Sequence, residues 1–162
     1  MSQINTYLYK KLEDLPFGIF NIMLNYSKIH NVRIAIVGGY IRDLLITKIH
    51  KKQFSNFIDL DVVIEGSAVS LAKFIKKNIQ NVGLCLIKEF DLYNTVELNI
   101  DNVKIDIASA REEIYPAPGF NPSVIDSTIE ADLKRRDFSI NAIAFEISDN
   151  KVHDLFDGLD HI

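Results

Sequence analysis

One seven-residue segment, Ile58–Ile64, constrains the fold more than any other part of the chain. In its sequence, Ile-Asp-Leu-Asp-Val-Val-Ile, strand alternation places Asp59 and Asp61 on one face and points Ile58, Leu60, Val62 and Ile64 to the other, into the core. Two adjacent carboxylates repel each other unless a cation neutralises them, and hard oxygen ligands suit Mg²⁺. The segment therefore predicts a metal-binding strand. Ordinary polar alternation on a solvent-facing strand is the alternative.

A third carboxylate, Asp106, lies on another predicted strand. In Val103–Ile107 the same alternation buries Ile105 and Ile107 and projects Asp106 from the opposite face. If this strand lies beside Ile58–Ile64, three carboxylates surround one volume, as a two-metal site requires. Taken alone, Asp106 is equally consistent with an exposed strand residue.

The rest of the chain alternates between helical and strand patterns. Apolar residues three and four apart predict an amphipathic helix over Leu8–His30, with a break at Pro16. A proline-rich region without periodicity, Arg111–Ser127, predicts a long loop. The other predicted elements are helices over Tyr40–Thr47, around Leu71–Ile75 and over Thr128–Asn141, and strands over Val32–Val37, Val82–Ile87, Thr95–Ile100, Val103–Ala108 and Ile143–Ile147. This order predicts an α/β (α+β) fold with a mixed sheet of about five strands flanked by helices.

The composition fits a single globular domain over residues 1–162. The chain has 48% hydrophobic and 25% charged residues, which is typical of such domains. The 18 Lys and Arg against 22 Asp and Glu give a net charge of −4, which excludes a polybasic nucleic-acid-binding protein. The single cysteine, Cys85, excludes an internal disulfide, and the histidines lack the spacing of a zinc site.

The first residues and the hydropathy pattern bear on location. Met1–Lys10 has neither the succession of a signal peptide nor the arginine-rich character of a transit peptide. No apolar run approaches the roughly 20 residues that cross a bilayer. We therefore expect no membrane association, and a location in the cytoplasm, or in an organelle interior such as the plastid stroma if the chain is organelle-encoded.

Two further segments are candidate anion-binding sites. Gly38-Gly39 follows a predicted strand and precedes a helix, so its backbone can approach a phosphate, and Arg42 in the first turn can add a bidentate contact. The spacing matches neither a Walker nor a Rossmann motif, and a plain tight turn is the alternative. Lys134–Asn141 places positive charge on the last predicted helix, where a solvated helix with an Asp132–Arg136 pair is the alternative.

Four segments occur in a characteristic order: G-G-x-x-R-D-L-L from Gly38, D-L-D-V-V-I-E-G from Asp59, the strand with Asp106, and R-R-D-F-S-I-N-A from Arg135. Together they resemble the class II tRNA nucleotidyltransferase and poly(A) polymerase family. This family includes the CCA-adding enzymes and belongs to the polymerase-beta-like nucleotidyltransferase superfamily. The resemblance runs from about Val32 to the end of the chain and identifies it as similar to the N-terminal catalytic head.

The resemblance implies a function and a set of site residues. The expected function is Mg²⁺-dependent addition of CMP or AMP, from CTP or ATP, to an RNA 3′ end, above all tRNA 3′ CCA addition or repair. The loop Arg111–Ser127 would be the flexible loop that helps to reshape the site, as in enzymes that add the terminal A. The implied metal-binding and catalytic residues are Asp59, Asp61 and Asp106, and the implied nucleotide-binding residues are Gly38, Gly39, Arg42, Arg136, Asp137 and Asn141.

The chain departs from the family in length. In the family, helical neck, body and tail domains follow the head, and the neck carries an E-D-x-x-R motif that selects the incoming base. No such motif occurs here. We therefore expect residues 1–31 to form an N-terminal helical extension, and a partner polypeptide or a longer parent chain to supply the neck and tail. Two alternatives are a non-catalytic nucleotide- or RNA-binding subunit and a poly(A) polymerase acting on other RNAs.

Overall fold

The computed structural model describes residues 2–52, 57–90, 94–114 and 123–162. The helices are α1 (Ser2–Glu13), α2 (Ile19–His30), α3 (Gly39–His50), α4 (Ala68–Asn78) and α5 (Ile129–Lys134). The strands are β1 (Ile34–Val37), β2 (Ile58–Ile64), β3 (Cys85–Phe90), β4 (Thr95–Ile100), β5 (Val103–Ser109), β6 (Arg111–Ile114), β7 (Ser123–Asp126), β8 (Ile143–Glu146) and β9 (Lys151–Asp154).

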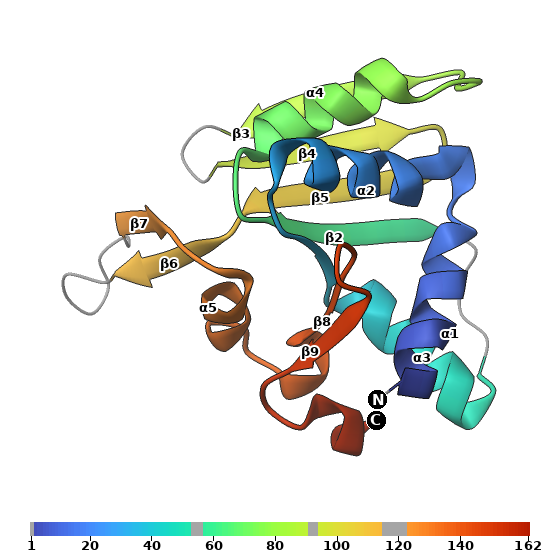
Figure 1. The fold of residues 1–162 in the computed structure, drawn as a ribbon, viewed down its shortest axis with the longest axis vertical. Helices are drawn as coiled ribbons and strands as arrows, with labels where there is room; N and C mark the ends of the chain where they lie inside the picture. The colour runs from blue at the N-terminus through green and yellow to red at the C-terminus, as the bar shows by residue number, and fades with distance from the viewer. Residues whose placement is uncertain (1, 53–56, 91–93, 115–122) are drawn as a thin grey trace.

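Seven strands form one mixed sheet in the order β3-β4-β5-β2-β1-β8-β9, and β6 and β7 form a separate ribbon that projects from it (Figure 1). The predicted fold class is confirmed, with seven strands where about five were expected. At the centre, β2 runs parallel to β5 and antiparallel to β1. This pairing aligns Asp61 with Asp106, so the strand that carries the third carboxylate does lie beside the first.

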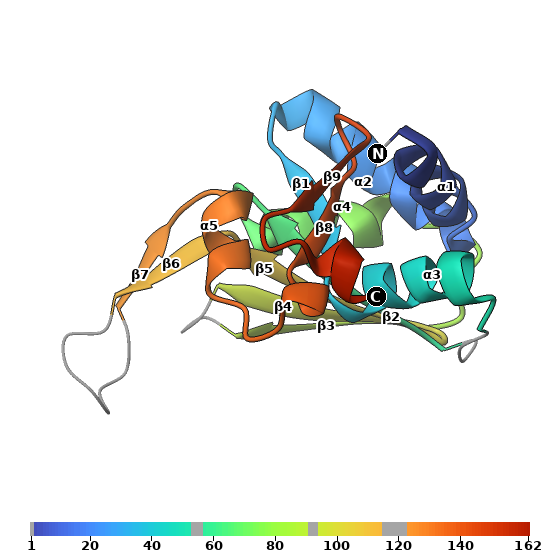
Figure 2. The same ribbon diagram turned by 90° about the horizontal axis from the view of Figure 1, so that it is seen from below.

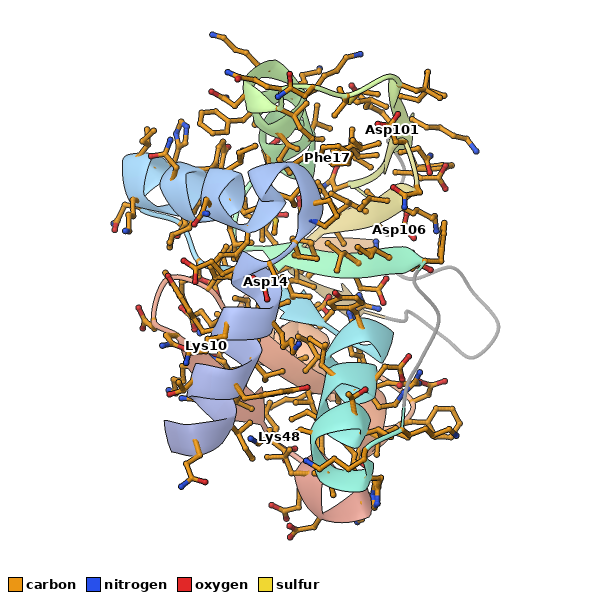
Figure 3. The ribbon with its side chains drawn as sticks, turned by 90° about the vertical axis from the view of Figure 1, so that its right-hand side faces the viewer. Lys10, Asp14, Phe17, Lys48, Asp101 and Asp106 are labelled. Atoms are coloured by element: carbon orange, nitrogen blue, oxygen red, sulfur yellow. The ribbon has the colours of Figure 1, made fainter. Side chains whose placement is uncertain are left out.

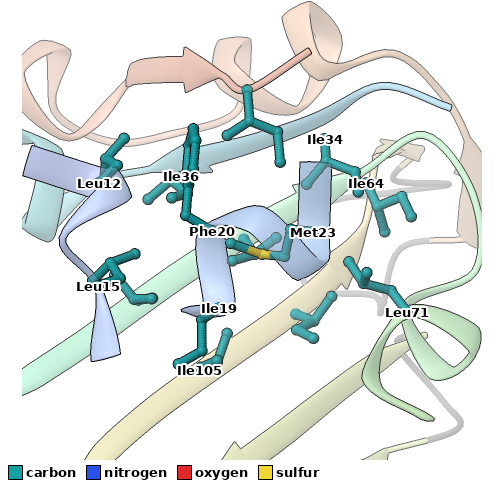
Figure 4. Close-up of a cluster of buried hydrophobic side chains, with 14 of the residues drawn as sticks. Leu12, Leu15, Ile19, Phe20, Met23, Ile34, Ile36, Ile64, Leu71 and Ile105 are labelled. Atoms are coloured by element: carbon teal, nitrogen blue, oxygen red, sulfur yellow. The ribbon is translucent and has the colours of Figure 1, made fainter. Parts of the chain in front are cut away.

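Alternation along β2 divides the core into two clusters. Leu60, Val62 and Ile64 point into the larger cluster, which the apolar residues of α1, α2, α3 and α4 fill from one side of the sheet (Figures 2 and 4). On the opposite side, Val63 belongs to a smaller cluster in which α5 packs on β1 and β8. That cluster contains Ala35, Val37, Val63, Ala110, Ile129, Leu133 and Ala144. Asp59 and Asp61 therefore lie on the same face of the sheet as α5, which covers this face near the C-terminal end of β2.

The N-terminal helical prediction is confirmed in outline. The expected helix over Leu8–His30 is two helices, α1 and α2, of 12 residues each. They are separated at Pro16–Gly18, where Phe17 and Gly18 have left-handed backbone conformations. Within the described ranges no helix is long and apolar enough to span a bilayer.

The expected long loop over Arg111–Ser127 is wrong in its described part. Arg111–Ile114 and Ser123–Asp126 pair as antiparallel strands, with Arg111 opposite Asp126. Backbone pairing needs no apolar alternation, so a short polar ribbon leaves little trace in hydrophobic periodicity. The prolines and glycine that suggested a loop fall in residues 115–122, outside the described residues.

The expected helix over Thr128–Asn141 is also too long. Helix α5 ends at Lys134, and a 3-10 turn over Ser139–Asn141 follows after a break. Ile129 and Leu133 supply one apolar face, but the next position on that face falls at the polar pair Arg136-Asp137. The charged segment therefore forms an exposed turn rather than a continued helix.

Two strands differ from expectation near the ends of the sheet. Strand β3 begins at Cys85 rather than Val82, because the Asp101 carboxylate accepts hydrogen bonds from the Gly83 and Leu84 N–H groups (3.2 and 2.9 Å). The sequence did not predict β9, which has four residues and buries a polar side chain, His153. Such a short strand shows too little alternation to be recognised.

Candidate active site

The three predicted catalytic carboxylates lie on one face of two neighbouring strands. Asp59 and Asp61 come from β2, and Asp106 comes from β5, directly beside Asp61 in the parallel register. Figure 3 shows Asp106 on the side of the sheet that lies away from α2. The structure therefore brings together residues that are about 45 positions apart in the sequence.

A lysine that the sequence did not single out lies among these carboxylates. Lys104 is two residues before Asp106, so it shares the same face of β5, and it aligns with Asp59 across the strand pair. Its Nζ donates a hydrogen bond to Asp106 Oδ2 at 2.6 Å and lies 3.7 Å from Asp59 Oδ1. The hydrogen bond to Asp106 is the main reason that the pKa of Lys104 is raised, so its amine is charged at neutral pH. Its two-residue spacing from Asp106 was the signal that could have identified it.

Asp61 is the most enclosed member of the group. Burial raises the pKa of Asp61, the positive charge of Arg136 opposes this effect, and Asp106 and Asp59 add to it. The fold thus disfavours the charged form of this carboxylate in the absence of a cation. An added positive charge beside Asp61 would reverse that balance.

Gly38 allows the backbone to pass close to Asp61. Its φ is +75°, and a Cβ at this position would lie 2.9 Å from Asp61 Oδ2 and 3.4 Å from Arg136 Nη1. Any side chain would therefore be both strained and in collision with the site. Gly39 begins α3, and there a Cβ would meet only ordinary contact with Arg42 at 3.6 Å. The strand, turn and helix predicted around this diglycine are confirmed.

Arg42 lies on α3 and contacts Asn141, 99 positions later. Its Nη1 donates to Asn141 Oδ1 at 2.9 Å, and its Nε donates to Asp43 Oδ1 at 2.8 Å. Two of the expected nucleotide-binding residues are therefore in direct contact. Asp43 holds the guanidinium from the other side, so its orientation is set by two partners.

Arg136 is placed differently from Arg135, its neighbour in the sequence. Both contact the buried carboxylate of Asp132, Arg135 at 2.6 Å and Arg136 at 3.4 Å. The expected Asp132–Arg136 pair is thus present, although Asp132 is buried rather than solvated. Only Arg136 of these two arginines is among the described residues that line the cavity beside Asp61. The buried Nε of Arg136 has no hydrogen-bond partner among the described residues, so a donor is available there.

The cavity beside the carboxylates has a volume of about 400 Å³. Its charged lining residues are Asp61, Glu97, Asp106 and Arg136. Val63, Ala108 and Phe90 contribute much of its apolar side. Asp59 lies at the rim of the carboxylate group with 57% of its side chain exposed. Asp137 is exposed on the turn after α5 and is not among the described lining residues.

The carboxylate group fits a hard divalent cation by its chemistry. Its donors are carboxylate oxygens, which Mg²⁺ prefers, and the ammonium of Lys104 already takes a cation position between Asp59 and Asp106. In the described ranges no three Asp, Glu, His or Cys side chains are gathered closely enough to hold one ion in this arrangement. The three carboxylates therefore suit a positive charge, and in this structure the oxygens of Asp59 and Asp106 lie around the Lys104 amine.

Comparison with known proteins connects this geometry with a family. Residues 34–162 match the Poly A polymerase head domain family. The chain is 38% identical to the A-adding tRNA nucleotidyltransferase of Aquifex aeolicus over 118 residues, which is 72% of this chain and 13% of that protein. It is 31% identical to the CC-adding tRNA nucleotidyltransferase of Deinococcus radiodurans over 133 residues, 78% of this chain and 31% of that protein.

Solved structures show the same fold. A CCA-adding enzyme in its apo form II superposes with a TM-score of 0.75 and 30% identity, covering 93% of this chain and 35% of that one. A tRNA nucleotidyltransferase complexed with a primer tRNA and an incoming ATP analog gives 0.65 and 31%, covering 85% of this chain and 35% of that one. The chain thus spans at most about a third of the length of these relatives. It belongs to the poly(A) polymerase head domain family, the head region of class II tRNA nucleotidyltransferases and CCA-adding enzymes.

Proposed function

We propose that this chain is the catalytic head of a Mg²⁺-dependent nucleotidyltransferase that adds CMP or AMP, from CTP or ATP, to the 3′ end of tRNA. The observation that carries the proposal is the convergence of Asp59, Asp61 and Asp106 on one sheet face, beside the cavity lined by Arg136. Family membership supports the reaction class, because curated relatives are named A-adding and CC-adding tRNA nucleotidyltransferases. We expect the activity in the cytoplasm or an organelle interior.

In the reaction, the RNA 3′-hydroxyl releases its proton to solvent, its oxygen forms a bond to the α-phosphorus of the nucleotide, and the bond from that phosphorus to pyrophosphate breaks. Bound Mg²⁺ ions would lower the pKa of the attacking hydroxyl and neutralise the triphosphate and its leaving group. Asp59 and Asp61 would hold both ions, and Asp106 would complete the ligand set of the one beside the hydroxyl. The enclosed position of Asp61 makes it the ligand whose charge depends most on the cation.

The basic residues would bind and orient the triphosphate. Arg136 has a buried Nε donor without a partner among the described residues, and it borders the same cavity as Asp61 and Asp106. Arg42 and Asn141 form a second polar pair beside the diglycine turn. Fixed donors of this kind stabilise charge that shifts in the transition state without any reorganisation at that moment. Gly38 leaves the space that these groups need.

Base selection and tRNA binding would depend on a further polypeptide, either a partner chain or the rest of a longer protein. Rejection of a wrong base needs polar groups fixed around the base edge. The expected family motif for that role does not occur in this sequence, and a net charge of −4 offers little basic surface for tRNA. We therefore expect the chain alone to bind nucleotides with Mg²⁺ but to discriminate poorly among bases.

The test is incorporation of label from α-labelled ATP or CTP into RNA by the purified chain, alone and with cell extract. The acceptors are tRNA lacking its CCA end, tRNA ending in CC, and an unrelated RNA primer. Transfer to tRNA supports the proposal, and equal transfer to the unrelated primer favours a poly(A) polymerase. Nucleotide binding without transfer in every arm favours a non-catalytic subunit. Faithful, terminated addition of C, C and A by the chain alone would show that base selection lies within these residues.

A further inference from the structure

We propose that Lys104 is a built-in cation of the carboxylate site, which a divalent metal must displace, so that this residue sets the metal affinity of the site. The inference rests on the proposed function, because it concerns the same three aspartates. It goes beyond that function by assigning a role to a side chain that is neither a metal ligand nor a nucleotide contact.

The position of Lys104 follows from the strand register. Lys104 and Asp106 lie two residues apart on β5, and Asp59 is directly opposite Lys104 on β2. The amine therefore lies between two carboxylates, 2.6 Å from Asp106 Oδ2 and 3.7 Å from Asp59 Oδ1. The Lys104 side chain is 29% exposed, less than Asp106 at 42% or Asp59 at 57%. The Lys104 side chain as a whole is thus less exposed than either of the carboxylates that its amine neutralises.

The amine and a metal ion compete for the same oxygens. Mg²⁺ binds carboxylate oxygens at about 2.0 to 2.1 Å, so an ion on Asp106 would stand within a few ångströms of an ammonium that bonds the same group. Two positive charges at that separation repel strongly in a partly enclosed site. Metal binding to Asp59 and Asp106 therefore requires the contact between Lys104 and Asp106 to break.

The Lys104 side chain can move away from Asp106, and another carboxylate is available to it. A lysine amine is carried on a flexible four-carbon stem, so it can leave one carboxylate without a backbone movement. Glu97 lies opposite Asp106 on β4 and faces the same cavity. It offers the ammonium another carboxylate within the same sheet face. Without metal, the positive charge of Lys104 offsets the repulsion among the three aspartate carboxylates. This stabilisation is lost when the metal ion displaces the amine.

The experiment measures metal binding directly, without turnover. Mn²⁺ is titrated calorimetrically at one neutral pH and ionic strength into the wild-type chain and into Lys104→Met, with Lys104→Gln as a second neutral variant. We expect both variants to bind Mn²⁺ at least tenfold more tightly than wild type. Their melting temperatures without metal should be lower, and their increases on saturation with Mn²⁺ should be larger. Lys104→Arg keeps the charge and should bind Mn²⁺ no more tightly than wild type.

The matched control is Lys73→Met. Lys73 lies on α4, where its Nζ is 3.2 Å from Glu89 Oε1, so the variant also removes one positive charge and one ion pair. Its Mn²⁺ affinity should stay within about twofold of wild type, because exposed pairs at a distance are screened. If Lys73→Met and Lys104→Met raise the Mn²⁺ affinity equally, the change in net charge explains the effect and the proposal is overturned.

The outcomes separate this inference from the proposed function. If wild type binds Mn²⁺ and the neutral Lys104 variants bind it equally or more weakly, the inference is wrong and the metal-dependent function stands. If neither wild type nor the variants bind Mn²⁺, the metal-dependent function itself is contradicted. If Mn²⁺ binds and Asp61→Asn abolishes binding in both backgrounds, the tighter binding of the Lys104 variants is assigned to this site.

Discussion

The two ends of β2 carry two groups of charged residues that differ in how completely their charges are paired. At one end, Asp59, Asp61 and Asp106 share an accessible face, and the Lys104 amine contacts Asp106 and Asp59. At the other end, Arg33 binds Glu65, Glu130 and Glu146 at 2.8, 2.6 and 2.9 Å, and His153 approaches Glu146 at 2.7 Å. We refer to these five residues as the Arg33 cluster. Arg33 donates a hydrogen bond to each of its three carboxylates, whereas Lys104 Nζ donates one to Asp106 and lies 3.7 Å from Asp59.

The acidities of the two groups differ accordingly. A hydrogen bond from Arg33 is the main reason that the pKa of Glu130 falls to about 2. Burial acts to raise the pKa of Glu146, but hydrogen bonds from Arg33, His153 and Ser148 together leave it below its ordinary value. The pKa of Asp61 is raised instead. The fold thus stabilises charged carboxylates at one end of β2 and leaves a carboxylate short of positive charge at the other, which distinguishes a structural cluster from a cation-binding one.

The largest expected effect is on activity at the carboxylate site. Asp61→Asn should reduce nucleotide transfer by roughly a thousandfold or more, because loss of a metal-held charge removes several kcal/mol of transition-state stabilisation. The free energy of unfolding without metal should stay equal or rise, since burial disfavours the charged form of Asp61. Labelled-nucleotide incorporation and urea denaturation measure the two quantities. Retention of most activity would contradict the metal assignment.

The opposite pattern is expected at the Arg33 cluster. Arg33→Met leaves three carboxylates without their shared cation, and Glu146 is only 2% exposed, so the free energy of unfolding should fall by about 3 kcal/mol or more. The free energy of nucleotide binding, measured on the folded fraction of Arg33→Met, should change far less than its free energy of unfolding does. Arg33→Lys keeps the charge but has fewer donors, so its free energy of unfolding should lie between those of wild type and Arg33→Met. A stability loss in Arg33→Met no larger than that in Asp61→Asn would erase the distinction between the two ends.

A smaller effect separates the two arginines that share Asp132. Arg136→Ala should weaken triphosphate binding at least tenfold, because a charge-assisted hydrogen bond contributes roughly 1.5 to 3 kcal/mol. Arg135→Ala should change it little, since Arg135 is not among the described residues that line the cavity. Titration of each variant with a non-hydrolysable nucleotide in the presence of Mg²⁺ gives the affinities. Equal small effects would return both arginines to a purely structural role.

The smallest expected effect is a pH dependence of stability from the Arg33 cluster. The pKa of Glu130 is lowered to about 2 from an ordinary value of 4.5, so the folded state binds its proton less readily than the unfolded state. Its contribution is complete above about pH 4.5 and is lost as the pH falls towards 2. Unfolding free energies measured between pH 6 and 3 should therefore decline less steeply in Glu130→Gln. The difference will be modest because Glu130 is partly exposed and solvent screens it.

The sequence pattern predicted the strands that are largely apolar and failed for the short polar ones. The bounds of β2 agree with expectation because seven alternating residues leave little freedom in register. Strand β9 and the ribbon of β6 and β7 have four residues in each strand, at most two of them apolar, whereas the equally short β1 and β8 are largely apolar and were predicted. Alternation singled out the three carboxylates, the resemblance to the family assigned their role, and the structure shows that the two strands adjoin.

The sequence missed the charged side chains whose partners are distant. The two-residue spacing of Lys104 from Asp106 places both on one face of β5, but its approach to Asp59 depends on β5 pairing with β2, which spacing along the chain does not contain. The Arg33 cluster joins residues from Arg33 to His153, so no local motif could reveal it. Pairing of this kind depends on tertiary structure, whereas alternation is local.

The length of helix α5 fixes where Arg136 lies relative to the Arg33 cluster. Near its N-terminus, Glu65 Oε1 accepts the Ile129 N–H at 2.9 Å and Glu130 binds Arg33, while at its other end Asp132 holds Arg136. Six residues thus act as a rigid spacer between the Arg33 cluster and the cavity. One inserted residue would turn everything beyond it by about 100° and advance it by about 1.5 Å, which would take Arg136 out of reach of the cavity. We therefore expect the cavity to tolerate substitutions on the exposed side of α5 better than an insertion or a deletion within it.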